Sequence, residues 1–124
     1  MRERKIQRGD IYHANLNPVI GSEQGGFRPV LIIQNNRGNQ YSPTVIVAAM
    51  SKKITEKADL PTHYKVQDYV GLKEESLVLL EQIRTIDKRR LIDYIGRLGK
   101  KDMEQVDRCL AVSLALKNRK TEGS

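Results

Sequence analysis

The chain is a succession of short apolar runs bounded by turn-forming residues, and this pattern limits it to a fold made mainly of β-strands. The runs are rich in Val, Ile and Leu, and Gly, Pro, Asn and Asp stand between them. Turn-forming residues between apolar runs are typical of antiparallel strands joined by turns. We expect strands at Asp10–Leu16, Pro29–Gln34, Thr44–Met50, Thr62–Val66, Leu77–Ile86 and Leu91–Leu98.

Only the end of the chain has helical periodicity. From Lys101 to about Leu116, apolar residues recur at three- and four-residue spacing, which predicts one amphipathic helix. The sequence therefore predicts a small, partly open barrel of about five to seven antiparallel strands, closed by a C-terminal helix. The segments between the strands are interpreted as a polar turn region at Asn35–Pro43, a mobile connection at Ser51–Asp59, a turn at Gln67–Gly71, a helical turn at Leu72–Ser76 and a charged turn at Asp87–Arg90.

A length of 124 residues suits a single domain with its own core. We divide the chain into a basic leader over residues 1–7, one domain over 8–117 and a flexible basic tail over 118–124. A lone cysteine, Cys109, excludes an internal disulfide or a Cys-rich metal site. No apolar N-terminal segment resembles a signal peptide or a membrane span, so we expect a cytoplasmic protein without membrane contact.

The formal net charge of +7 raises the question of a nucleic-acid partner. Most of the excess lies in the two ends, so the body of the domain is only weakly positive. Basic ends add salt-dependent affinity for phosphates, but they also serve simply to solubilise a chain, and composition leaves both readings open. The basic residues of the two ends are Arg2, Arg4, Lys5, Arg8, Lys117, Arg119 and Lys120.

A glycine-rich segment, Gly21–Gly26, precedes Arg28 and the second predicted strand. Its glycines let the backbone approach a ligand closely, and a guanidinium at its mouth suits the extra negative charge of a phosphodiester under attack. Arg28 has structural alternatives, which are to bind loop carbonyls or to pair with Glu23. Ser51 follows the third predicted strand and would share one rim with Arg28 if strands two and three pair antiparallel.

Several enzyme classes lack sequence support. The chain has no Walker phosphate loop, no dinucleotide-binding glycine pattern, no His-Glu-x-x-His and no Cys-x-x-Cys. His13 and His63 could form an acid–base pair if the fold brought them together, but a histidine within a strand more often has a packing or surface role.

Five blocks of sequence carry a family resemblance: Arg8–Tyr12, Pro18–Asn35, Tyr41–Ala49, Leu60–His63 and Leu80–Asp87. In order and spacing they closely resemble the MazF/PemK toxins of bacterial toxin–antitoxin systems, most strongly the MazF type of Gram-positive bacteria. The resemblance runs from about Arg8 to Leu116 and omits only the basic ends.

The resemblance implies a CcdB/PemK-like fold, which is a small SH3-like β-barrel, and a homodimer with RNA across its interface. It implies a sequence-specific endoribonuclease that needs no metal or cofactor and cleaves single-stranded mRNA, which halts translation. The products would be a 2′,3′-cyclic phosphate and a 5′-hydroxyl, and a MazE-like antitoxin would block the RNA groove. A CcdB-like toxin that binds gyrase and a non-catalytic RNA-binding member remain alternatives, because one fold hosts several functions.

Carried over to this sequence, the family's catalytic arginine falls on Arg28 and its catalytic threonine on Ser51, where a serine keeps the hydroxyl but lacks the methyl group. Arg28 is assigned to transition-state charge, and the proton transfers stay open among Arg28, Ser51, Glu23 and solvent. The implied RNA-binding residues are Ser22, Glu23, Gln24, Gly25, Glu81 and Gln82.

Overall fold

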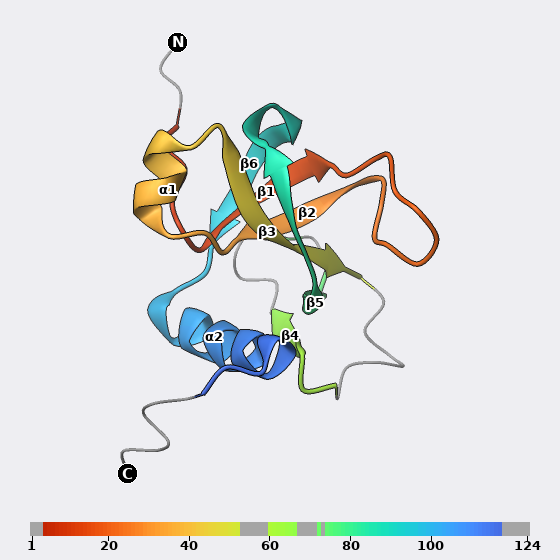
Figure 1. Ribbon diagram of the computed structural model, residues 1–124, viewed down its shortest axis with the longest axis vertical. Helices are drawn as coiled ribbons and strands as arrows, with labels where there is room; N and C mark the ends of the chain where they lie inside the picture. Colours follow the sequence, from red (N-terminus) through yellow and green to blue (C-terminus); the bar gives the residue numbers. More distant parts are fainter. Residues whose placement is uncertain (1–3, 53–59, 67–71, 73, 118–124) are drawn as a thin grey trace.

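The computed structural model describes residues 4–52, 60–66, 72 and 74–117. Six strands form one antiparallel sheet in the order β4-β5-β3-β2-β1-β6, and the sheet curls into a half-barrel whose open edges are β4 and β6 (Figure 1). The partly open barrel predicted from the sequence is confirmed. The strands are β1 (Asp10–Asn15), β2 (Phe27–Ile32), β3 (Thr44–Ser51), β4 (His63–Val66), β5 (Ser76–Asp87) and β6 (Leu91–Arg97).

Apolar side chains are buried on both faces of the sheet, because successive residues of a strand point to opposite sides. One cluster contains Ile11, Leu31 and Met50 and is closed by α2 (Lys100–Leu114), whose Val106 is fully buried. The second cluster, on the other face, contains Val30, Ile32 and Val47, with further residues of β1, β3 and β5. Two buried faces explain why the strands read as continuous apolar runs rather than as strict alternation.

The C-terminal helix occupies the predicted place but ends two residues early. Its last residue is Leu114, and Ala115 adopts a left-handed conformation with φ 57°. The N–H of Leu116 then donates to the Ala111 carbonyl at 2.8 Å. The helix stops because this left-handed cap closes its last turn, a feature that apolar spacing does not reveal.

A second helix, α1 (Asn36–Tyr41), corrects the prediction of a polar turn region at Asn35–Pro43. The Asn35 side chain caps it by accepting from the Gly38 N–H at 2.8 Å. Asn39 is buried, and its amide donates to the Gln34 carbonyl at 2.9 Å. This buried polar contact stabilises a helix that contains Gly38 and two asparagines, which are residues of low helix propensity, so tertiary structure overrides local preference.

The remaining segment predictions have mixed outcomes. The helical turn predicted at Leu72–Ser76 is wrong for the described residues of that stretch, none of which is helical, and Ser76 already begins β5. The charged turn at Asp87–Arg90 is confirmed as a short 3₁₀ helix, Lys88–Arg90. Residues 53–59, 67–71 and 118–124, which hold most of two predicted connections and the C-terminal tail, lie outside the described residues. Among the helices that are described, none has the length and apolarity to cross a membrane.

Candidate active site

Arg28 and Ser51 lie at one rim of the sheet, where β2 begins and β3 ends. β2 pairs with β3 antiparallel in a register that sets Val30 opposite Ala49, and continuing that register sets Arg28 opposite Ser51. Both residues line one cavity of about 220 Å³. The other lining residues are Phe27, Pro29, Met50, Lys52 and Ser76. The structure therefore brings the two predicted catalytic residues together.

The Arg28 guanidinium is fixed by two backbone carbonyls. Its Nε donates to the Gly25 carbonyl at 2.8 Å, and an Nη donates to the Met50 carbonyl at 3.0 Å. Burial lowers the pKa of Arg28. The carbonyl-binding alternative weighed from the sequence is therefore present, and it is compatible with a ligand role because a guanidinium has five N–H donors. The suggested pair with Glu23 does not form, since the Glu23 carboxylate accepts from the Ile20 N–H at 2.8 Å.

The glycine-rich loop depends on its glycines at two positions. A Cβ on Gly25 would lie 2.6 Å from a methyl carbon of Val19, so no other residue fits there without a shift of the loop. Gly26 has φ +79° and donates its N–H to the Asn17 side chain at 2.9 Å. These contacts hold the Gly25 carbonyl where Arg28 reaches it.

A bulge in β5 positions Glu81 and Gln82. Ala48 of β3 pairs with Ile83, but the next residue, Ala49, pairs with Leu79, so Leu80–Gln82 have no partner on β3. A bulge bends its strand and redirects the side chains within it. The Gln82 amide oxygen accepts from the Gln24 N–H at 3.4 Å, and the two residues line a cavity of about 200 Å³ together with Glu23, Ala49, Ile83 and Arg84.

Glu81 is oriented by two residues of the neighbouring β4 region. Thr62 donates its hydroxyl to Oε1 at 2.9 Å, and the ring Nε2 of His63 lies 2.8 Å from Oε2. The His63 side chain is 1% exposed, whereas that of Glu81 is 39% exposed. Burial alone would raise the pKa of Glu81, but the hydrogen bonds from His63 and Thr62 outweigh it and the net pKa is lowered. Sequence reasoning missed Thr62 and assigned no such role to His63.

Five of the eight predicted site residues line one of two cavities. Arg28 and Ser51 share one cavity, and Glu23, Gln24 and Gln82 line another. Neither cavity includes the exposed Ser22, nor Gly25 or Glu81. The two histidines do not meet: His13 in β1 contacts Asp93, and His63 in β4 contacts Glu81, with β5, β3 and β2 between the two strands. Within the described residues, no cluster of three or more His, Cys, Asp or Glu side chains has the arrangement of a metal site.

Comparison with known proteins shows which family the chain belongs to. Residues 7–114 match the model of the PemK-like, MazF-like toxins of type II toxin–antitoxin systems. The chain is 55% identical over 112 residues to endoribonuclease EndoA of Bacillus subtilis (strain 168), which covers 90% of this chain and 96% of the relative.

Solved structures share the fold. MazF from Deinococcus radiodurans superimposes with a TM-score of 0.79 at 20% identity, covering 92% of this chain and all of that one. An endoribonuclease in complex with its cognate antitoxin from a mycobacterial species superimposes with a TM-score of 0.73 at 24% identity, covering 94% and 99%. These structures support the curled barrel, while the family model and the Bacillus relative carry the assignment. The chain belongs to the PemK-like, MazF-like toxin family of type II toxin–antitoxin systems.

Proposed function

We propose that this protein is a toxin that cleaves single-stranded mRNA endonucleolytically and without a metal ion, and so inhibits translation. One observation carries the proposal: Arg28 and Ser51 face one cavity at an open rim of the sheet, beside a glycine-rich loop. A fixed cation and a hydroxyl suit phosphoryl transfer, whose transition state adds negative charge at the phosphate. The 55% identical relative, named as an endoribonuclease, supports the same class of reaction.

The RNA supplies its own nucleophile in this reaction. The 2′-oxygen attacks the adjacent phosphorus, a bond from O2′ to phosphorus forms, and the bond from phosphorus to O5′ breaks. The 2′-hydroxyl loses a proton and the departing 5′-oxygen gains one, so no net water is consumed and the products are a 2′,3′-cyclic phosphate and a 5′-hydroxyl. Proton transfer is left to Arg28, Ser51, Glu23 or solvent.

Arg28 holds the transferring phosphate in this scheme. Its bonds to Gly25 and Met50 use two of five N–H donors, and other donors can face the phosphate oxygens. Because the guanidinium is already fixed, little side-chain entropy is lost when it binds. Ser51 donates its hydroxyl to a second oxygen. The neighbouring nucleotides are bound and recognised by residues of the loop and of the bulge, namely Ser22, Glu23, Gln24, Gly25, Glu81 and Gln82.

The proposal extends to partners. We place the protein in the bacterial cytoplasm as a homodimer that is inhibited by a MazE-like antitoxin. Exposed apolar residues at the end of α2 support an interface, since Val112 is 54% exposed and Leu114 47% exposed. One of the solved structures with a similar fold is an endoribonuclease in complex with its cognate antitoxin, which supports that kind of partner.

Incubation of the purified protein with a long single-stranded RNA in EDTA tests the function. We expect discrete cuts by the native protein, and a cleavage rate at least about 10³-fold lower for Arg28→Ala, because one arginine that meets transition-state charge has an effect of that size. The circular dichroism spectrum of the variant should match that of the native protein, which serves as the folding control. RNA retained without cuts would indicate a binding protein, and neither binding nor cutting would indicate a toxin of the gyrase-binding class. Near-normal cutting by folded Arg28→Ala would refute the site.

A further inference from the structure

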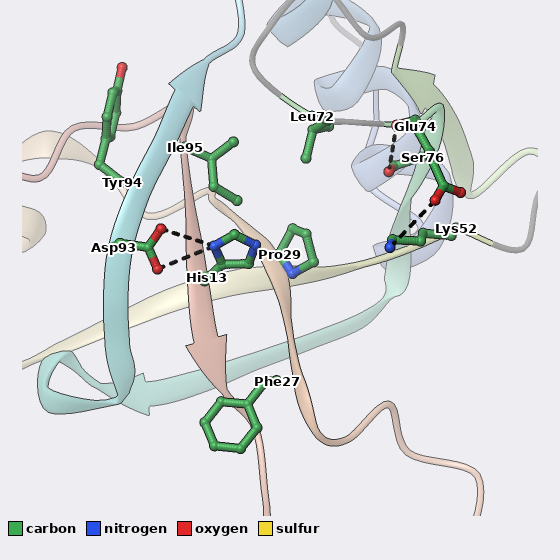
Figure 2. A pocket seen from close by; sticks show the side chains of 10 residues that line it. All are labelled: His13, Phe27, Pro29, Lys52, Leu72, Glu74, Ser76, Asp93, Tyr94 and Ile95. Atoms are coloured by element: carbon green, nitrogen blue, oxygen red, sulfur yellow. Dashed lines mark hydrogen bonds and ion pairs between the residues drawn. The ribbon is translucent and has the colours of Figure 1, made fainter.

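A second hollow adjoins the Arg28–Ser51 cavity. It has a volume of about 450 Å³ and lies between β1, β2, β6 and the segment that enters β5 (Figure 2). Phe27, Pro29, Lys52 and Ser76 line both hollows, so the two are continuous along the rim. Its other lining residues are His13, Leu72, Glu74, Asp93, Tyr94 and Ile95. The function proposed above does not use this hollow.

Phe27 stands where the two hollows meet. Phe27 is the residue before Arg28 and the only phenylalanine of the chain. It is 72% exposed. It belongs to neither apolar cluster, so it contributes little to the core. An exposed aromatic ring beside a phosphate-binding arginine is the arrangement with which proteins stack the bases of single-stranded RNA.

Polar groups at the sides of the hollow suit a nucleotide. His13 Nδ1 lies 3.2 and 3.1 Å from the two carboxylate oxygens of Asp93, which orients the ring. Figure 2 shows the opposite edge of that ring turned toward Pro29 and the interior of the hollow. Lys52, whose Nζ lies 3.7 Å from the Glu74 carboxylate, borders the hollow on the side shared with Ser51. The hollow therefore offers a stacking surface and an imidazole edge, and its lysine is paired with a carboxylate that also lines the hollow.

We propose that this hollow is a nucleotide subsite, in which the base next to the scissile phosphate stacks on Phe27. The inference rests on the proposed RNA cleavage. It adds a residue that requires a base, of any kind, at that position. Stacking on an aromatic ring tolerates any base but requires one. Loss of the ring should therefore weaken RNA binding, with the chemistry at Arg28 and Ser51 left intact.

The kinetic test compares Phe27→Ala with Phe27→Trp and a matched control. Tyr41 is 71% exposed, as much as Phe27, but lies on α1 at the other end of the sheet (Figure 1). Phe27→Ala should lower kcat/KM on a short RNA by about 5- to 150-fold, the equivalent of about 1–3 kcal/mol of stacking, mainly through KM. Phe27→Trp should keep near-native values, and Tyr41→Ala should not change them.

A fluorescent base locates the subsite directly. 2-Aminopurine is placed at each position beside the mapped cut in an RNA made uncleavable by a 2′-deoxy substitution there. Binding to the native protein should quench the fluorescence at one adjacent position, and Phe27→Ala should remove that quenching. An RNA that is abasic at that position should be cut equally by the native protein and Phe27→Ala.

The outcomes separate the subsite from the function. If the native protein cuts the RNA but no adjacent position is quenched, or if Phe27→Ala cuts as well as the native protein, the subsite is refuted and the nuclease stands. If Phe27→Ala changes the dimer mass in light scattering while its quenching persists, Phe27 belongs to a protein interface and the subsite is also refuted. An RNA that the native protein leaves intact refutes the proposed function itself.

Discussion

Arg28 illustrates how a residue can be structural and functional at once. Its bonds to Gly25 and Met50 tie the glycine-rich loop to the end of β3, and the same bonds orient the guanidinium at the cavity. From the sequence, these two roles were competing readings of one residue. Because the guanidinium has more donors than the carbonyls use, the roles are compatible.

Ser51 provides a direct test at the residue scale. Replacement of Ser51 by Ala should lower kcat by about 10²- to 10³-fold, the usual effect of removing one donor to a developing oxyanion. Ser51→Thr should retain or improve the rate, because the added methyl restricts the rotamer and keeps the hydroxyl. Single-turnover cleavage measures both, and equal rates for the Ala variant and the native protein would exclude a chemical role for the hydroxyl.

The lowered pKa of Glu81 predicts that the stability of the protein depends on pH. The pKa of Glu81 in the folded protein is lowered below the ordinary value of 4.5. The ionised carboxylate therefore adds stability that is fully present above about pH 4.5 and is lost as the pH falls through the folded pKa. Glu81→Gln should therefore be less stable than the native protein at neutral pH, and the difference should shrink toward pH 3. Urea unfolding at several pH values measures this. A constant difference across the range would mean that the carboxylate contributes nothing through its charge.

At the scale of elements, the strands were predictable because each apolar run is bounded by turn residues. The bulge in β5 was not predictable, since Leu77–Ile86 reads as one continuous run and the register against β3 is set by residues distant in sequence. The bulge nevertheless determines where Glu81 and Gln82 point. The candidate site residues were thus predicted one by one, while their distribution over two separate cavities required the tertiary structure.

Helix α1 was missed for a related reason. Asn36, Gly38 and Asn39 favour turns, and the helix is stabilised by a cap from Asn35 and by the buried contact of Asn39 with Gln34. Replacement of Asn35 by Ala should lower the free energy of unfolding by about 0.5–2 kcal/mol, as for other N-cap residues. The exposed Gln40 of the same helix is the matched control, and Gln40→Ala should stay within about 0.5 kcal/mol of the native protein. Equal stability of the two variants would show that the cap is dispensable.

At the scale of the whole molecule, two different structural features occupy the two ends of the sheet. The loop before β2 and the end of β3 form the candidate catalytic rim, and α1 lies at the opposite end (Figure 1). The weak charge of the body fits a protein that holds RNA by loop contacts and stacked bases rather than by a broad positive field. The same open rim is where an antitoxin would have to bind to block cleavage.

The central claim is that the RNA's own 2′-oxygen attacks the phosphate at the Arg28–Ser51 cavity. The direct measurement uses a short RNA containing one mapped cut site and a second RNA that differs only by a 2′-deoxy nucleotide on the 5′ side of the cut. In EDTA, the native protein should cut the first to a 2′,3′-cyclic phosphate and a 5′-hydroxyl and leave the second intact, although both bind with similar affinity. Cleavage of the deoxy-substituted RNA at the same bond, or a 5′-phosphate product, would contradict the account.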